Sequence, residues 1–190
     1  MFNLPNLLTW SRLLAIPLLM AMYSLPIPIT TSNIAATAIF AMAAVTDWFD
    51  GWLARRLGLT SAFGAFLDPV ADKLIVCTAL VFLVELQRVD SIIAVIIIGR
   101  EITISALREW MATMGARASV AVNWLGKLKT VSQLIAIPML LFDDTLFGFI
   151  DCHLVGTWLI VLAAVLTVWS MLYYLKRAWP VLRAGGGTGL

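Results

Sequence analysis

The feature that most constrains this chain is a series of six apolar segments, each long enough to cross a bilayer. They lie at about 7–27, 33–56, 68–88, 91–114, 124–142 and 154–175. A spanning helix needs about 20 mostly apolar residues to cross roughly 30 Å of hydrocarbon. Only 13% of the 190 residues are charged, about half the share expected in a soluble domain. The sequence therefore predicts an all-α polytopic membrane protein with six transmembrane helices.

The connections between these segments are short and leave no room for a separate soluble domain. We expect one membrane domain over residues 1–178 and a flexible C-terminal tail over 179–190, which ends in "AGGGTGL". The first segment has a weak basic start, contains Pro17 and Pro26, and lacks a clear cleavage site. It is therefore expected to be retained as a helix rather than removed as a signal peptide.

Basic residues gather on one side of the membrane when the N-terminus is placed in the cytoplasm and the six helices cross in turn. Of the 13 lysines and arginines, all but Arg88 and Arg100 then fall at cytoplasmic ends or loops. The outer turns instead carry acidic residues, namely Asp90, Asp143, Asp144 and Asp151. The positive-inside rule predicts from this asymmetry that both termini face the cytoplasm.

Cysteine and histidine are too scarce for several kinds of chemistry. Cys77 and Cys152 lie in separate segments, and the single histidine, His153, falls near the outer face. This usage argues against a disulfide framework, a zinc site and a histidine base.

Four aspartates gather where the second and third segments meet, in "DWFDGWLARRLGLTSAFGAFLDPVADK" from residue 47 to 73. Asp47 and Asp50 are three residues apart and Asp68 and Asp72 are four apart, so each pair shares a helix face. Asp68-Pro69 is typical of an N-cap followed by proline at the first helical position. If the two helices pack, two carboxylate pairs face each other near the membrane surface.

Four carboxylates this close together need compensating positive charge, because like charges in a poorly hydrated site favour protonation. One or two divalent cations are the simplest compensation, and oxygen ligands without His or Cys favour Mg²⁺, Mn²⁺ or Ca²⁺ over zinc. Arg55 and Lys73 lie nearby and would suit an anionic ligand. A single aspartate here could be a helix cap, but ionisable residues within membrane segments are functional candidates by default.

The spacing of the whole stretch matches a pattern: Asp-x-x-Asp-Gly-x-x-Ala-Arg, eight residues, then Gly-x-x-x-Asp-x-x-x-Asp. This pattern resembles the signature of the CDP-alcohol phosphatidyltransferases, integral membrane enzymes of phospholipid synthesis that typically have six helices. The similarity extends over residues 3 to about 175. The matching positions are Asp47, Asp50, Gly51, Ala54, Arg55, Gly64, Asp68 and Asp72.

The resemblance implies a role for each of these positions. The four aspartates would hold two divalent cations, Mg²⁺ or Mn²⁺, and Asp72 would also serve as the general base. Gly51, Ala54 and Gly64 would leave room for the cytidine nucleotide, and Arg55 would contact its phosphates. Ser61 lies in the same loop, where it would help bind the nucleotide or simply be solvated. The implied contacts to the CDP-lipid are Asp47, Gly51, Ala54, Arg55, Ser61 and Gly64.

A second stretch, "GREITISALREWMATMGARASVAVNWLGKLKT" from residue 99 to 130, is basic and is expected on the same side. An acceptor with its own phosphate would need such a pocket. Cytoplasmic loops are also basic for topological reasons alone, which is the favoured explanation for Arg117 and an equal one for Lys129. "SALREWM" and "WLGKLKT" resemble bacterial family members that use glycerol 3-phosphate. That similarity implies that Arg108 and Lys127 bind the acceptor phosphate.

The N-terminal "NLPNLLTWSR" resembles the same members and implies that Asn6, Thr9 and Arg12 lie near the acceptor pocket. Arg12 could equally be an interfacial anchor. The implied reaction transfers the phosphatidyl group of CDP-diacylglycerol to glycerol 3-phosphate and releases CMP. The implied setting is the bacterial inner (cytoplasmic) membrane, with the site facing the cytoplasm, membrane lipid around the chain, and a homodimer as the common assembly. A nucleic-acid partner is not expected.

Three alternatives remain open from the sequence. Another family member, above all a CDP-diacylglycerol-dependent cardiolipin synthase, would use phosphatidylglycerol as the acceptor. A divalent cation transporter would also use paired carboxylates, although its site would be expected near the membrane midplane rather than at one face. A structural membrane protein would leave the four aspartates unexplained.

Overall fold

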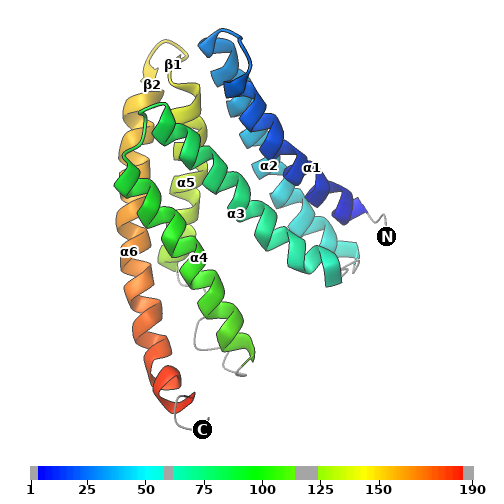
Figure 1. Cartoon of the computed structure of the whole chain (residues 1–190), viewed down its shortest axis with the longest axis vertical. Helices are drawn as coiled ribbons and strands as arrows, with labels where there is room; N and C mark the ends of the chain where they lie inside the picture. The colour runs from blue at the N-terminus through cyan, green and yellow to red at the C-terminus, as the bar shows by residue number, and fades with distance from the viewer. Residues whose placement is uncertain (1–3, 58–61, 114–123, 186–190) are drawn as a thin grey trace. The chain divides into compact units, whose positions relative to one another are not determined.

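The computed structural model describes the backbone of residues 4–57, 62–113 and 124–185, and the side chains of residues 9–47, 67–111 and 128–176. Within these ranges the chain forms six helices and one short hairpin (Figure 1). The mainly helical fold predicted from the sequence is confirmed, and each apolar segment coincides with a helix. The elements are α1 (Leu4–Ser24), α2 (Ile29–Leu57), α3 (Ala62–Glu85), α4 (Ser91–Thr113), α5 (Trp124–Phe142), β1 (Thr145–Leu146), β2 (Ile150–Asp151) and α6 (Cys152–Gly185).

Among the described residues, two stretches are long and apolar enough to cross a membrane. They are Ile29–Asp47 in α2 and Cys152–Lys176 in α6, and α5 adds a shorter apolar stretch, Leu128–Phe142. Charged residues lower the apolar character of α3 and α4. Those residues are Asp68, Asp72, Lys73 and Glu85 in α3, and Arg100, Glu101, Arg108 and Glu109 in α4.

The chain divides into two compact units, and α5 and α6 contribute to both. Unit 1 comprises Met1–Val89 and Leu134–Thr157, and unit 2 comprises Asp90–Gln133 and Trp158–Leu190. In unit 1, α1 packs against both α2 and α3 (Figure 1). The buried faces of α2 and α3 follow the helical spacing of three or four residues and are rich in alanine, which lets helices approach closely. These residues are Ala36, Phe40 and Ala43 in α2, and Ala71, Ile75 and Ala79 in α3.

Unit 2 has its own apolar cluster beside a buried charged group. Ile104 and Met111 of α4 are buried with Tyr174 of α6. Arg100, only 5% exposed, lies 6.0 Å from the centre of the Tyr174 ring and donates to Ser170 Oγ over 3.2 Å. The guanidinium is therefore held between α4 and α6.

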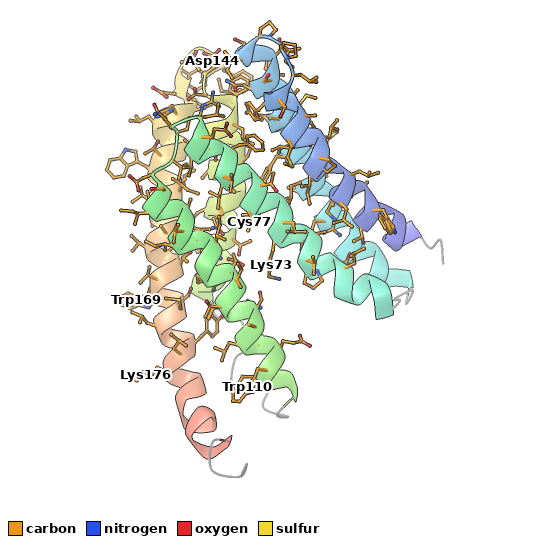
Figure 2. All side chains as sticks on the ribbon, viewed as in Figure 1. Lys73, Cys77, Trp110, Asp144, Trp169 and Lys176 are labelled. Carbon is orange, nitrogen blue, oxygen red and sulfur yellow. The ribbon has the colours of Figure 1, made fainter. Side chains whose placement is uncertain are left out.

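Large apolar side chains also cover outward-facing surfaces of the helices. Trp169 is 65% exposed on the outer side of α6 (Figure 2), and Leu14 on α1 is 66% exposed. Exposed apolar surface of this extent suits contact with lipid rather than with water.

Arg88 connects several segments at one end of unit 1. A Schellman motif closes α3: the Arg88 amide donates to the Leu83 carbonyl (2.8 Å), and Gln87, at φ 57°, donates to Val84 (3.0 Å). The Arg88 guanidinium then donates to the carbonyl oxygens of Leu140 and Leu141 at the end of α5 (3.1 and 2.9 Å). A positive group at this helix end satisfies carbonyls that lack intrahelical partners.

Three further residues complete this Arg88 network. Arg88 donates to Asn33 Oδ1 of α2 (3.1 Å) and pairs with Asp143 (2.9 Å), while the other Asp143 oxygen lies 2.7 Å from His153 Nδ1 of α6. The lone basic residue predicted on the outer side is thus a connection between α2, α3, α5 and α6.

The start of α3 differs from the sequence-based prediction. The helix begins at Ala62, so the interpretation of Asp68-Pro69 as an N-cap and first helical residue is wrong. Pro69 instead lies inside the helix, where its missing amide costs one hydrogen bond that the surrounding packing must offset. Asp68 and Asp72 still share a face, because both lie within the helix.

The C-terminal end also differs from the expected tail, since α6 continues to Gly185 and so includes residues 179–185. Residues 186–190 lie outside the described part of the chain.

Candidate active site

Three of the four signature aspartates meet around one arginine of α1. Asp47 is on α2, and Asp68 and Asp72 are one turn apart on α3. Arg12 Nη1 lies 2.7 Å from Asp47 Oδ1 and also donates to Asp72 Oδ1, while Nη2 lies 3.2 Å from Asp68 Oδ1. One guanidinium therefore joins carboxylates that are 35 to 60 residues away in the sequence. We call Arg12, Asp47, Asp68 and Asp72 the aspartate site.

The charged groups of the aspartate site differ in their exposure. The Arg12 side chain is 1% exposed, whereas those of Asp47, Asp68 and Asp72 are 50%, 44% and 43% exposed. Arg12 thus forms the buried floor, and the carboxylates form a rim that a ligand can reach. A buried arginine needs such partners, because leaving its charge unpaired is costly.

Thr9 adds a hydrogen bond on the same side of α1. It lies one turn before Arg12, is 2% exposed, and its hydroxyl donates to Asp68 Oδ1. The resemblance implied that Thr9 and Arg12 lie near an acceptor pocket, with an interfacial anchor as the equal alternative for Arg12. Their contacts with the aspartates were not predicted. A usable signal was present, because an arginine inside an apolar segment needs a charged partner.

The charges of the aspartate site suit a divalent cation. Three carboxylates against one guanidinium leave two negative charges among the described groups, and carboxylate oxygens are the ligands that Mg²⁺ and Mn²⁺ prefer. Among the described side chains, no three acidic, histidine or cysteine groups are already arranged around a common metal position. Asp50, the fourth predicted ligand, has a side chain outside the described part. The carboxylate oxygens of the aspartate site therefore suit a divalent cation, and Arg12 lies between these carboxylates.

Several predicted site residues fall outside the described side chains. The backbone of α2 includes Asp50, Gly51, Ala54 and Arg55, that of α3 includes Gly64, and that of α5 includes Lys127. Ser61 and Arg117 lie outside the described residues altogether. Lys73, predicted near the anionic ligand, donates from Nζ to the Pro69 carbonyl over 2.8 Å.

Three other basic residues predicted for the acceptor, Arg108, Lys127 and Lys129, belong to unit 2. Lys129 is 2% exposed and pairs with Glu101, which also accepts a bond from Arg100 at 3.2 Å. Glu101 therefore neutralises part of the basic charge of unit 2. Arg108 lies on the exposed side of α4, where its guanidinium can meet a ligand from solvent.

Comparison with known proteins agrees with the signature. The family model described as CDP-alcohol phosphatidyltransferase matches residues 2–169, most of the chain. A CDP-diacylglycerol--glycerol-3-phosphate 3-phosphatidyltransferase of Shigella flexneri serotype 5b is 50% identical over 179 residues, covering 93% of this chain and 95% of that protein. The protein of the same description from Escherichia coli strain K12 is 49% identical over the same coverage. This chain therefore belongs to the CDP-alcohol phosphatidyltransferase family.

Proposed function

We propose that this chain transfers the phosphatidyl group of CDP-diacylglycerol to glycerol 3-phosphate, giving phosphatidylglycerol phosphate and CMP. The observation that carries the chemistry is the convergence of Asp47, Asp68 and Asp72 on Arg12. The choice of acceptor is supported by relatives that carry this activity in their names and are about 50% identical over 93% of the chain. A cardiolipin synthase or a cation transporter is not favoured.

The family is generally dependent on divalent cations, and the aspartate site supplies suitable ligands. Asp47, Asp50, Asp68 and Asp72 would hold two ions, Mg²⁺ or Mn²⁺. When bound, the ions would stabilise negative charge on the transferring and leaving phosphates.

The protein side chains orient the reactants and move one proton. The acceptor hydroxyl oxygen forms a bond to the lipid-linked phosphorus, the bond from that phosphorus to the CMP oxygen breaks, and the hydroxyl proton passes to Asp72. Arg12 holds the Asp72 carboxylate toward the rim, and Thr9 and Arg12 together fix Asp68. Most of the acceleration then comes from positioning and electrostatics.

The remaining predicted residues complete the two substrate sites. Gly51, Ala54 and Gly64 leave space for the nucleotide beside Asp47. Arg55 contacts its phosphates, and Ser61 helps to bind the nucleotide. Arg108 and Lys127 bind the phosphate of glycerol 3-phosphate, and Lys129 supports that pocket through its pair with Glu101.

We further propose that all six helices cross the bacterial inner membrane, with both termini and the aspartate site on the cytoplasmic side. Asp47 is eighteen residues beyond Ile29, which is about 27 Å along a helix and close to the thickness of the hydrocarbon. The site would therefore lie at the boundary where a lipid substrate and a water-soluble acceptor can meet. A homodimer is the assembly that we expect.

The test is CMP release by the purified protein with CDP-diacylglycerol and Mg²⁺. Glycerol 3-phosphate, phosphatidylglycerol, serine and inositol phosphate are supplied in separate reactions. We expect release only with glycerol 3-phosphate, and loss of release when the divalent cation is chelated. Release with a different acceptor would overturn the assignment of Arg108 and Lys127. No release of CMP from folded protein with any acceptor would refute the proposed transferase activity.

Asp72→Asn tests the proposed base, with Asp90→Asn as the matched control. Asp90 accepts a bond from the Ile92 amide (2.7 Å) at the start of α4, a role that asparagine performs equally well. We expect Asp72→Asn to lower kcat by about 10²–10⁴-fold and Asp90→Asn to leave it unchanged.

A further inference from the structure

The β1–β2 hairpin carries two phenylalanines on a tight turn between α5 and α6 (Figure 1). Phe147 and Phe149 are 80% and 79% exposed, and their rings stack with centroids 6.4 Å apart. Leu146 beside them is also exposed. We call Leu146, Phe147 and Phe149 the aromatic tip, which presents apolar surface where two helices end.

The backbone of this turn makes Phe147 an unexpected residue. The Phe149 amide donates to the Leu146 carbonyl (3.4 Å), and the two residues between them have positive φ, 55° at Phe147 and 76° at Gly148. Positive φ at both central positions is typical of a type I′ turn, which favours Asn-Gly, Asp-Gly or Gly-Gly. Glycine adopts this conformation freely, whereas a bulky residue adopts it at a cost. The turn therefore holds a large ring against its own local preference, which points to a contact outside the hairpin.

The base of the hairpin keeps the aromatic tip in place. The Asp144 carboxylate accepts a hydrogen bond from the Thr145 amide (2.7 Å), and the Asp144 carbonyl accepts one from the Cys152 amide (3.3 Å). Asp151 caps α6 by accepting a bond from the Leu154 amide (2.9 Å). The two rings are thus presented by a bonded turn, so a contact with them requires little further ordering of the chain.

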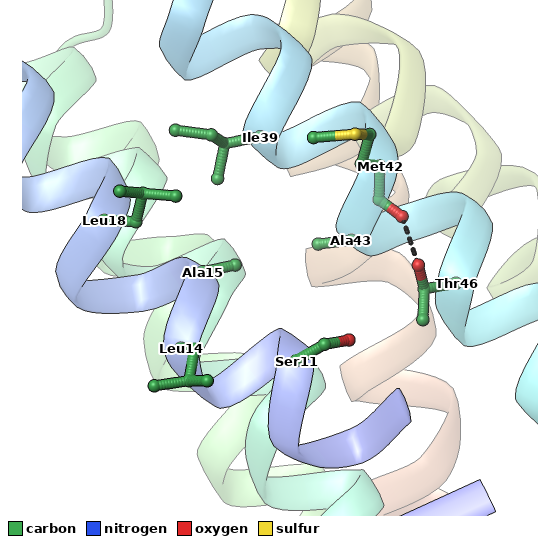
Figure 3. A pocket seen from close by; sticks show the side chains of 8 residues that line it. All are labelled: Ser11, Leu14, Ala15, Leu18, Ile39, Met42, Ala43 and Thr46. Carbon is green, nitrogen blue, oxygen red and sulfur yellow. Dashed lines mark hydrogen bonds between the residues drawn. The ribbon is translucent and has the colours of Figure 1, made fainter. Parts of the chain in front are cut away.

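Other exposed apolar side chains of unit 1 lie on regular helices. Leu14, Leu18 and Met42 line a groove between α1 and α2 (Figure 3). Helix geometry alone brings such residues to the surface, because a helix has outward-facing positions along its whole length. The turn instead exposes Phe147 at a conformational cost. The aromatic tip is therefore an exposed apolar surface that helix geometry does not explain.

The length of α6 places the aromatic tip near one face of a bilayer. The apolar stretch Cys152–Lys176 has 25 residues and is about 37 Å long. That exceeds the roughly 30 Å of hydrocarbon, but not the roughly 40–45 Å that include both headgroup layers. A two-residue strand extends the hairpin by only about 7 Å. The tip therefore lies at the level of the headgroups, where aromatic side chains are enriched.

The charge beside the tip favours one kind of lipid surface. Asp144 (Figure 2) and Asp151 are exposed, and within the described part of the chain neither side chain forms a salt bridge. Their negative charge repels anionic headgroups and attracts the ammonium group of zwitterionic headgroups.

We propose that the aromatic tip inserts into the headgroup layer of a zwitterionic lipid surface and anchors the ends of α5 and α6 there. Removing the two rings from water offsets the cost of the positive φ at Phe147. The inference requires α6 to cross the bilayer, but it is independent of the proposed transferase activity. Loss of CMP release would leave the anchor standing, and a tip found in water would leave the activity standing.

Fluorine NMR measures where the rings lie. In nanodiscs of phosphatidylethanolamine and phosphatidylcholine, p-trifluoromethylphenylalanine replaces Phe147 or Phe149, so the tip keeps both rings. The same residue at Trp158, which is 70% exposed on α6, is the reference for hydrocarbon, and one added after Leu190 is the reference for water. Two reagents broaden the signals, namely oxygen, which concentrates in the bilayer, and a water-soluble nickel chelate.

We expect both tip positions to give broadening between the two references. Nickel broadening equal to that of the water reference would overturn the proposal, and so would protection from both reagents by a protein contact. In nanodiscs of phosphatidylglycerol the nickel broadening should increase, because Asp144 and Asp151 are then repelled. Equal broadening in the two kinds of lipid would overturn the preference for zwitterionic headgroups.

Phe147→Asn provides a second test, in which the two possible surroundings predict opposite signs. Asparagine suits the positive φ, so in water the change should raise the thermal midpoint. At the headgroup level the lost ring contact outweighs this gain, and we expect the midpoint in zwitterionic nanodiscs to fall by about 2–4 °C. Phe147→Tyr keeps the ring and is the matched control, with an unchanged midpoint expected. An unchanged or raised midpoint for Phe147→Asn would overturn the proposal.

Discussion

Arg12 shows how one residue organises the aspartate site. Its guanidinium is buried while the three carboxylates that it contacts are about half exposed. The carboxylates are therefore brought together and oriented by one protein charge, yet stay accessible to cations and to an incoming hydroxyl. Because Arg12 supplies only one positive charge, the site retains an attraction for further cations.

Arg12→Gln is expected to destabilise the protein and to make its stability more dependent on Mg²⁺. Without the guanidinium, three carboxylates repel one another, although their exposure lets water screen part of the effect. We expect a loss of about 1–2 kcal/mol without divalent cations. Thermal unfolding measured across a Mg²⁺ titration should show a larger upward shift for the variant than for wild type. Lys176→Gln, on an exposed side chain of α6, is the control, and parallel titration curves for Arg12→Gln and wild type would contradict this role.

The helices of unit 1 are joined by close packing and by the Arg88 network. Where α6 begins, Gly156 faces α5 so closely that an added Cβ would lie 2.7 Å from Leu140 Cγ and 3.3 Å from the Ala136 carbonyl. Gly99 in α4 has nothing within 4 Å of the equivalent position. The same type of residue therefore serves a packing role in one helix and has no such constraint in another.

Gly156→Ala and Gly99→Ala should consequently change stability in opposite directions. The first forces α5 and α6 apart and is expected to cost about 1–3 kcal/mol. The second removes a flexible glycine from a helix interior and is expected to gain about 0.5–1 kcal/mol. Thermal unfolding of the two variants beside wild type measures both effects. Equal shifts would mean that α5 and α6 are not in close contact at Gly156.

Arg88→Met tests the polar connection between the same elements. The change removes the donors to the Leu140 and Leu141 carbonyls and to Asn33, and leaves Asp143 without its cation. Breaking a largely buried pair of this kind is expected to cost about 3–5 kcal/mol. The thermal midpoint should fall, while CMP release per folded molecule stays at the wild-type level. Lys176→Met is the control, and an unchanged midpoint for Arg88→Met would show that these contacts contribute little.

The whole molecule combines a charged site with surfaces suited to lipid. In unit 1 the aspartates lie near the start of α1 and the end of α2, whereas the β1–β2 hairpin follows the far end of α5. Gly148, at φ 76°, lies in the turn of this hairpin, and Phe147 beside it is 80% exposed. The proposed orientation places the hairpin outside the cytoplasm.

Phe147→Cys, in a chain with Cys77 and Cys152 replaced by serine, tests this orientation. A membrane-impermeant maleimide should label the new cysteine from the periplasmic side of oriented vesicles and not from the cytoplasmic side. A cysteine added after Leu190 should show the reverse pattern. Labelling of both from the same side would show that α6 does not cross the membrane and would refute six crossings.

Local sequence patterns were sufficient to predict the helices and the shared face of Asp68 and Asp72. Long apolar runs predicted all six helices, because every backbone group in such a run can be satisfied within the helix itself. Most ends were predicted to within four residues, but α3 begins six residues before its predicted start and α6 ends ten residues after its predicted end. The spacing of Asp68 and Asp72 placed them on one face because helix geometry depends only on near neighbours. The prediction that Asp68-Pro69 starts a helix was wrong, because a proline marks a helix start only when no tertiary packing stabilises the turn before it.

Tertiary structure alone decided which charges meet. Thr9 and Arg12 contact aspartates on two other helices, and Arg88 caps a helix end more than 50 residues away. From the sequence, an acceptor pocket and the membrane interface were equally plausible locations for Arg12, because its charge alone does not specify a partner. The sequence determined the six helices and the faces of the aspartates through local geometry. The partners of Arg12 and Arg88 depended on how those helices pack, because side chains this distant meet only through tertiary contacts.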